Sequence, residues 1–307
     1  MSYKQYFNTY CQSVTCVWKL DSNKKGVRVA RYIVKSLFHP LASMKWAYAL
    51  RNLPELRLWL GRNPRLLLKP SRHYINRNYN FDLRIQIISN HYTMLMRLLS
   101  QPSFEALAEG NHLVLATLEG KKGQRYEITI GQTDKFDREG ELLLQLRGNA
   151  ECLVVSSLVF SLNIYGDHAG VEIGCIQGPK GKNGYEIIKR ATKCLYGIRP
   201  KNLLADALYA LVSAWNLTEY FGVCNTSRIY KCDQVQADYD AFWLELGSAP
   251  GNNGMFRLPA KLYHHQLSEV QSRHRSEYRQ RIKLRDMLGK QISLAASNLG
   301  TSINRIY

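Results

Sequence analysis

Hydrophobic and polar positions change their spacing several times along the chain. Between residues 25 and 99 apolar side chains recur every three or four positions, with a break at Pro40, which predicts several short helices. Between residues 112 and 164, β-rich runs are separated by turn residues, a pattern typical of antiparallel strands. Helical spacing returns at residue 185 and is interrupted by a strand-like run at 218–223. The pattern predicts an α+β protein with a mixed, mostly antiparallel sheet flanked by helices, after a helical N-terminal region.

One stretch combines a strand, a glycine-rich basic loop and a helix. Residues 171–176 form an apolar run, residues 177–184 contain three glycines and two lysines, and helical spacing opens at Tyr185. Glycines let backbone N–H groups approach a ligand, and a helix N-terminus adds unpaired donors and partial positive charge. The loop is not a Walker A motif, because Asn183 stands where Ser or Thr is required. It is interpreted as a generic phosphate cradle or, alternatively, as a solvated connector.

A second helix start competes for the same role. Residues 199–202 (Arg-Pro-Lys-Asn) precede a continuous apolar stripe over 203–215, and proline is favoured in the first turn of a helix. This helix directly precedes the strand-like run at 218–223, so the helix at 185 would then be an insertion. Further on, Asp238 is interpreted as the cap of a short helix. Both helix starts remain candidates for a phosphate cradle.

Positive charge is concentrated in the first third of the chain. The net charge is +18, and the first 100 residues contain seventeen Lys and Arg against Asp21, Glu55 and Asp82. Residues 273–285 form a second basic segment with helical spacing. Such a field favours an anionic partner, which can be nucleic acid, an acidic lipid surface or an acidic carrier protein. Nucleic acid is the least favoured, because no recognised RNA-binding module is present.

Cysteine, histidine and hydropathy patterns bear on the compartment and on metals. The seven cysteines are scattered and form no C-x-x-C pair, which favours a reducing compartment. The eight histidines show no metal-ligand spacing, so no metal site is predicted. The most apolar early segment, residues 32–50, is interrupted by charged residues and Pro40. We expect a cytoplasmic protein with no membrane-spanning segment.

The predicted order of elements resembles the Gcn5-related acyltransferase fold. In that family the pyrophosphate of coenzyme A, or the phosphopantetheine of a carrier protein, binds backbone N–H groups at a helix start. Here the glycine spacing after Gln177 departs from the family's loop, and Pro179 removes one donor. The resemblance implies a donor site at eight positions: Gln177, Gly178, Gly181, Lys182, Arg199, Lys201, Asn202 and Asn225.

The same resemblance implies three catalytic candidates. Tyr230 corresponds to a tyrosine that protonates the departing thiolate, and a phenol with its ordinary pKa of about 10 suits that role. Glu172 and His168 are candidates for the base that activates the acceptor. The alternatives are a solvated strand position for Glu172 and a turn position for His168. Transfer chemistry also requires a tunnel that reaches the sheet beside Asn225 and Tyr230 and is lined by Ile176 and Val223.

Four sequence blocks are similar to the bacterial VirK/YbjX family. They are residues 174–179, residues 199–204, the motif Asn225-x-x-Arg228-x-Tyr230 and residues 238–247. That family is associated with virulence, envelope properties and resistance to cationic antimicrobial peptides. The resemblance covers nearly the whole chain.

These observations lead to two hypotheses of different classes. The first is an acyltransferase-like protein of the VirK/YbjX family at the bacterial envelope, peripheral on the inner membrane, with a donor that is a coenzyme A thioester or the phosphopantetheine of an acyl carrier protein. The second is a non-catalytic binding protein that docks on an anionic membrane or an acidic partner through its basic N-terminal third. We expect three regions: 1–105 basic and helical, 106–256 acyltransferase-like, and 257–307 a basic helical tail.

Overall fold

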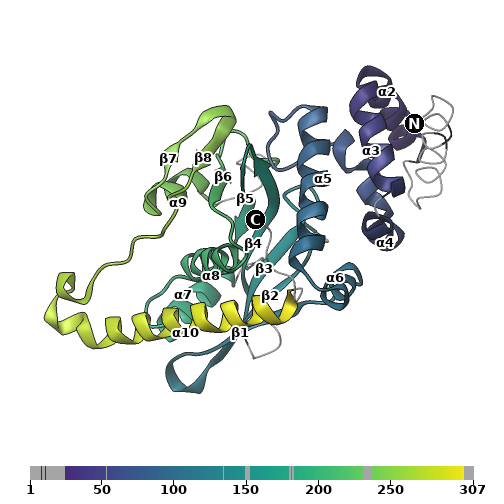
Figure 1. The fold of residues 1–307 in the computed structure, drawn as a ribbon. Coiled ribbons are helices and arrows are strands. Elements are labelled where there is room, and N and C mark those ends of the chain that lie inside the picture. The colour runs from purple at the N-terminus through teal and green to yellow at the C-terminus, as the bar shows by residue number, and fades with distance from the viewer. Residues whose placement is uncertain are drawn as a thin grey trace.

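Figure 1 shows the fold as a mixed sheet with helices on both faces. The computed structural model describes residues 8, 11 and 25–300, except 53, 134, 149–152, 180, 182 and 231–236. Within these residues most buried apolar side chains form one large core that extends from Tyr32 to Ala296, and Leu143, Val159 and Cys175 form a second, small cluster.

The N-terminal helices come before the sheet in the chain. They are α2 (Lys25–Phe38), α3 (Pro40–Asn52), α4 (Pro54–Arg62), the 3-10 helix η1 (Pro64–Ser71), α5 (Phe81–Leu98) and α6 (Gln101–Ala108). Helices α5 and α6 pack against the sheet, and α2, α3 and α4 pack on η1, α5 and α6. Pro40 begins α3 because proline is tolerated in the first turn but breaks a helix interior. Trp59 of α4 contacts Tyr92 of α5, with ring centroids 5.2 Å apart. The predicted series of short helices is confirmed.

In the described part of the chain, the sheet contains eight strands in the order β1-β2-β3-β4-β5-β6-β8-β7. Their bounds are β1 (Leu113–Glu119), β2 (Arg125–Gln132), β3 (Leu142–Gly148), β4 (Leu153–Tyr165), β5 (His168–Gln177), β6 (Glu219–Val223), β7 (Ala249–Pro250) and β8 (Met255–Arg257). Neighbouring strands pair antiparallel except β5 and β6, which pair in parallel. The predicted mixed, mostly antiparallel sheet flanked by helices is therefore confirmed.

Helices on the opposite face of the sheet from α5 belong to the second half of the chain (Figure 1). They are α7 (Gly184–Cys194), α8 (Pro200–Ala214) and α10 (Arg275–Leu299), and the short α9 (Tyr239–Glu245) lies beside β6. The short 3-10 helices are η2 (Lys121–Gly123), η3 (Asn252–Gly254), η4 (Leu267–Glu269) and η5 (Ser272–His274). The apolar stripe of α8 is buried on β4, so β4 is covered on both faces.

The basic helix α10 packs on the protein along much of its length. Its Gln291 side chain bonds the backbone N–H of Thr117 at 2.7 Å and the carbonyl of Thr117 at 3.0 Å, on the edge strand β1. Arg285 donates to the carboxylate of Asp206 on α8 at 2.9 Å. Part of the charge in residues 273–285 therefore serves internal contacts.

Candidate functional site

The sheet opens at the carboxyl end of β5. Residues 170–173 of β5 pair in parallel with residues 219–222 of β6, and the pairing stops there. β5 continues along β4 as far as Gln177, whereas β6 ends at Val223. The two parallel strands therefore separate. The last residues of β5 pair with β4 but not with β6.

A bulge in β5 lies where the opening begins. Gly174 is an extra residue between Ile173 and Cys175, which face the consecutive residues 159–160 of β4. A Cβ atom at Gly174 would lie 2.0 Å from the carbonyl oxygen of Glu139. The backbone of the segment before β3 therefore covers the bulge closely, and this position requires glycine.

Aromatic side chains of α9 fill the inner part of the opening. The indole N–H of Trp243 donates to the carbonyl of Val223 at 2.9 Å, and a Cβ at Gly222 would lie 2.6 Å from the Trp243 ring. Tyr239 is buried, and burial raises the pKa of its hydroxyl well above the usual range. The predicted tunnel between Ile176 and Val223 is therefore filled at its Val223 end.

The outer part of the opening is a cavity of about 250 Å³ between the end of β5, the start of α8 and α9. It is lined by Val155, Ser156, Ile176, Gln177, Gly178, Ile188, Arg199, Pro200, Lys201, Ala237, Asp238 and Phe242. Apolar side chains form most of the wall, and a few polar groups converge on it, which is the usual composition of a small-molecule site. We call it the β5–α8 cavity.

Residues of both candidate phosphate cradles lie at the same cavity. Gln177 and Gly178 at the end of β5, and Arg199 and Lys201 at the start of α8, line the same cavity. Sequence spacing leaves them as alternatives, because more than twenty positions of loop and α7 separate them. The fold brings both segments to opposite sides of one cavity.

A carboxylate of the chain itself occupies the start of α8. Glu245 of α9 accepts from Asn202 at 2.8 Å, forms an ion pair with Arg199 and lies 3.9 Å from Lys201. An anion is stabilised at this place because the first N–H groups of a helix have no partner in the helix. Lys201 also lies 4.3 Å above the Phe242 ring, and burial, followed by the charge of Arg199, lowers its pKa.

Three other predicted donor positions, Gly181, Asn202 and Asn225, are not part of the cavity lining. The Asn225 side chain donates to Asp238 at 2.7 Å and accepts from the Tyr239 N–H at 2.9 Å, so it stabilises the start of α9. Asp238 caps the same helix by accepting from the Ala241 N–H at 3.0 Å, which confirms its predicted capping role. Gly181 is exposed in the loop before α7, and Lys182 lies outside the described residues.

Tyr230 is half-buried and does not line the β5–α8 cavity. The Arg138 guanidinium lies 5.5 Å from the centre of its ring. The contact places Tyr230 beside the segment that covers the Gly174 bulge, whereas the cavity opens at the start of α8.

Glu172 is buried and bonded by three donors. Its carboxylate accepts from the Tyr79 and Tyr165 hydroxyls, each at 2.9 Å, and from the Asn163 amide at 2.7 Å. Burial raises the pKa of Glu172 more strongly than these bonds lower it. The solvated strand position considered for Glu172 is therefore wrong, because the N-terminal segment that carries Tyr79 covers this face of β5.

His168 lies at the opposite end of β5 from the β5–α8 cavity. The nine residue steps from His168 to Gln177 correspond to about 30 Å of extended strand. His168 is exposed and lines a separate cavity of about 250 Å³ with residues of α5 and of the turn after α8. It cannot act on a group bound at the other end of the strand.

The buried state of Glu172 predicts a pH dependence of stability. Its folded-state pKa is raised above the ordinary value near 4.5, so the stability linked to it is fully present below about pH 4.5 and is lost as the pH rises through the folded-state pKa. The Glu172→Gln variant does not have this loss. As the pH rises, its free energy of unfolding should therefore increase relative to that of the wild type by up to about 1.4 kcal/mol per pH unit. Urea denaturation between about pH 5 and pH 8 measures the difference.

Glu186→Gln provides the matched control, because Glu186 is exposed on α7 and pairs with Lys189 at 4.0 Å. This variant should follow the wild-type pH profile throughout. Parallel profiles for Glu172→Gln and the wild type would show that the carboxylate at residue 172 ionises in the folded protein without a penalty.

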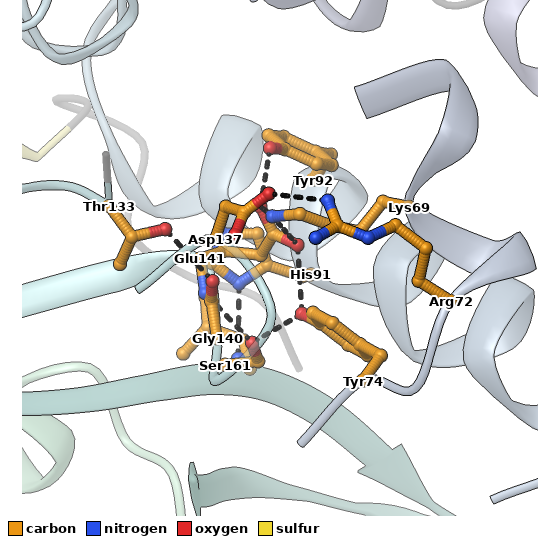
Figure 2. A network of polar contacts seen from close by, with 11 residues as sticks. Lys69, Arg72, Tyr74, His91, Tyr92, Thr133, Asp137, Gly140, Glu141 and Ser161 are labelled. Atoms are coloured by element: carbon orange, nitrogen blue, oxygen red, sulfur yellow. Dashed lines mark hydrogen bonds and ion pairs between the residues drawn. The ribbon is translucent and has the colours of Figure 1, made fainter. Parts of the chain in front are cut away.

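A second buried carboxylate joins the N-terminal helices to the sheet (Figure 2). Both Glu141 oxygens accept from the Lys69 ammonium at 2.7 Å, and the two side chains are 2% and 6% exposed. The hydroxyls of Tyr74 and Tyr92 donate to the same carboxylate at 2.8 and 2.7 Å. Ser161 bonds both the Tyr74 hydroxyl and the Glu141 N–H. We call these residues the Glu141 network.

His91 extends the Glu141 network toward β4. Its Nδ1 accepts from the Leu162 N–H at 3.1 Å, and burial lowers its pKa well below the ordinary value, so the ring is neutral. The sequence contains one signal of this network: Glu141 directly precedes the apolar strand β3, where a buried charge requires a partner. The partner, Lys69, is 72 positions earlier and has no local signal.

Among the described residues, no group of three or more His, Cys, Asp or Glu side chains is arranged to hold a metal ion. No helix within the described part of the chain has the length and hydropathy needed to cross a bilayer.

Comparison with known proteins identifies relatives over most of the chain. YbjX of Escherichia coli (strain K12), an uncharacterized protein, is 28% identical over 270 residues, which are 86% of this chain and 82% of YbjX. An uncharacterized protein of Haemophilus influenzae is 26% identical over 225 residues, 71% of this chain and 73% of that protein. Membrane protein LapB of Mannheimia haemolytica is 20% identical over 195 residues, 63% of this chain and 81% of LapB.

No solved structure matches the chain. Residues 21–293 match the family described as "Protein of unknown function (DUF535)", and this range covers more than half of the sequence. The chain therefore belongs to the DUF535 family together with YbjX, as its resemblance to the VirK/YbjX proteins predicts.

Proposed function

We propose that the protein is an acyltransferase-like member of its family that acts at the bacterial envelope. The proposed donor is a coenzyme A thioester or the phosphopantetheine of an acyl carrier protein, with its arm in the β5–α8 cavity. One observation carries the proposal: a strand end and a helix start enclose a single cavity where two parallel strands separate. The strand order supports it, because an antiparallel meander followed by one parallel pair resembles the Gcn5-related acyltransferase fold.

The residues around the cavity match the two halves of such a donor. Ile176, Ile188 and Phe242 provide an apolar wall for the pantetheine arm. Arg199 and Lys201 provide cationic donors beside the α8 N-terminus, where the helix dipole also favours phosphate. The Glu245 carboxylate forms ion pairs with Arg199 and Lys201 in the structure, so a bound phosphate must displace this carboxylate.

The proton-transfer roles divide differently from the sequence prediction. Within the proposal the acid role of Tyr230 rests on its resemblance to the family's tyrosine alone, because Tyr230 does not line the cavity. Glu172 is not retained as the base, since three donors hold its carboxylate beneath Tyr79. His168 is not retained either, because it lies at the far end of β5.

Coenzyme A binding should depend on the charge of Lys201. We expect Lys201→Gln to weaken binding roughly tenfold, because a charge-assisted hydrogen bond contributes about 1.5–3 kcal/mol and each tenfold change corresponds to about 1.4 kcal/mol. Isothermal titration calorimetry with coenzyme A and with a phosphopantetheine-bearing carrier protein measures the effect, and native mass spectrometry shows whether either is retained.

Lys193→Gln is the matched control, because it removes one exposed lysine from α7, outside the cavity lining. Equal weakening by both substitutions would mean that only the overall charge matters. If neither donor raises the melting temperature or is retained by the wild type, the donor site does not exist.

A second function is favoured by the aromatic filling of the opening. Because Tyr239 and Trp243 occupy the inner space beside Val223, the β5–α8 cavity can bind a ligand without a route to an acceptor. In that case the protein is a non-catalytic binding protein. Binding of coenzyme A thioesters with no thiol release in the presence of envelope lipids would favour this second function.

A further inference from the structure

An exposed apolar face runs along α2 and the start of α3. Its large side chains are exposed by 49% at Val34, 71% at Leu37, 78% at Phe38 and 74% at Leu41, and Val27 is exposed by 60%. We call these five residues the α2–α3 ridge. Apolar side chains this exposed, on consecutive turns of one segment, are typical of an interaction surface.

The ridge is exposed because the other side of α2 provides the packing. Tyr32 and Ser36 are buried, and the Ser36 hydroxyl bonds the Tyr32 carbonyl at 2.8 Å. Val27 and Val34 are spaced by seven positions, two helical turns, so they share one stripe of α2, and Leu41 follows at the start of α3. Within the described protein α2 therefore packs through one face and leaves an apolar face exposed.

The charge of these helices selects the partner. The sequences of α2 and α3 contain no Asp or Glu, and Lys25, Arg28, Arg31 and Lys35 recur along α2 at close to helical spacing. Each basic residue near an anionic membrane contributes attraction, and an interfacial helix combines such charge with an apolar face. A second copy of the chain is disfavoured, because two ridges in contact would bring like charges together.

We propose that the α2–α3 ridge docks on the surface of an anionic phospholipid bilayer. The apolar ridge inserts at the level of the headgroups, and the net positive charge of the α2 and α3 sequences attracts the phosphates. In Figure 1, α2 and α3 lie at the edge of the molecule far from α9, so a docked protein leaves the β5–α8 cavity uncovered. The proposal is independent of the donor site.

Vesicle co-sedimentation with the full chain tests the proposal. The wild type should bind vesicles of phosphatidylglycerol and phosphatidylethanolamine and should bind phosphatidylcholine vesicles weakly. Raising the ionic strength from about 0.1 M to about 1 M shortens the Debye length from about 10 Å to about 3 Å and should weaken binding. The double substitution Phe38→Gln with Leu41→Gln should weaken it roughly tenfold or more, because both apolar side chains leave the interface.

A matched double substitution separates docking from general loss of surface hydrophobicity. Tyr185→Gln with Leu294→Gln also removes one aromatic side chain and one leucine, which are 73% and 64% exposed on α7 and α10. This control should bind anionic vesicles as the wild type does. Both double variants should keep the wild-type melting temperature, since the substituted side chains are exposed.

Three outcomes would overturn the proposal. The first is a wild type that does not bind phosphatidylglycerol vesicles. The second is equal vesicle binding by the wild type and the Phe38 and Leu41 double variant. The third is a wild-type dimer in analytical ultracentrifugation that this double variant converts to a monomer, which would assign the ridge to a second copy of the chain. None of these three outcomes bears on coenzyme A binding. Membrane docking by the α2–α3 ridge and the donor site in the β5–α8 cavity can therefore be refuted independently.

Discussion

Replacing Lys69 with methionine is expected to lower the free energy of unfolding by about 3–5 kcal/mol. Lys69 and Glu141 form an ion pair at 2.7 Å with both side chains buried, and methionine keeps the length of the side chain but removes the charge. The carboxylate of Glu141 would then lie in the core with only neutral donors, Tyr74 and Tyr92, to stabilise it. Urea denaturation at neutral pH measures the loss.

Two further variants show that the loss comes from an uncompensated buried charge. Lys69→Met combined with Glu141→Gln should recover most of the stability, because the glutamine side chain is neutral, and its amide oxygen can accept from one tyrosine hydroxyl while its amide N–H donates to the other. Arg62→Met breaks an ion pair with Glu109 whose partners are 57% and 50% exposed, and should change stability by less than about 1 kcal/mol. A double variant no more stable than Lys69→Met alone would contradict this account.

The Glu141 network connects the N-terminal third of the chain to the sheet. Lys69 belongs to η1 among the N-terminal helices, whereas Glu141 directly precedes β3 of the sheet. Glu172 forms the same kind of connection with Tyr79, which lies two residues before the start of α5. Two buried carboxylates of the sheet are therefore held by hydrogen-bond donors from the N-terminal third.

Gly174→Ala is the second substitution with a large expected effect, a loss of about 3 kcal/mol in the free energy of unfolding. The new Cβ would lie 2.0 Å from the carbonyl oxygen of Glu139, and this oxygen belongs to backbone that cannot rotate away. Either β5 or the segment before β3 must move. Because the bulge lies at the opening of the sheet, we also expect coenzyme A binding to weaken. Denaturation and calorimetry measure the two effects.

Gly289→Ala is the control for a glycine without a close neighbour. A Cβ at Gly289, in α10, would meet nothing within 4 Å. Because alanine is favoured over glycine in a helix interior, this variant should gain up to about 1 kcal/mol. A Gly174→Ala protein as stable as the wild type would show that the covering segment moves freely and that the bulge is not tightly enclosed.

Local patterns in the sequence are sufficient to predict most elements of this fold. The apolar stripe over residues 203–215 predicts α8, and the β-rich runs between residues 112 and 164 predict the antiparallel meander. The capping role of Asp238 follows from its place before an apolar helix. These features depend on residues within one or two turns of each other, so spacing alone determines them.

Positions of candidate site residues depend on contacts between distant segments. Glu172 looks like a solvated strand residue until Tyr79, 93 positions earlier, covers it. Gln177 and Lys201 look like parts of rival sites until α7 and α8 pack on the sheet and place both beside one cavity. Aromatic filling beside Val223 likewise comes from α9, a separate element.

The sequence by itself therefore determined the α+β class, the order of most helices and strands, the positive charge of the N-terminal third and the resemblance to the VirK/YbjX proteins. The tertiary structure alone decided which carboxylates are buried, that two candidate cradles share one cavity, and that α2 keeps an apolar face exposed. The physical reason is the range of the interactions. Periodicity and capping act over a few residues, whereas burial and ion pairing join side chains tens of positions apart, and no local pattern records them.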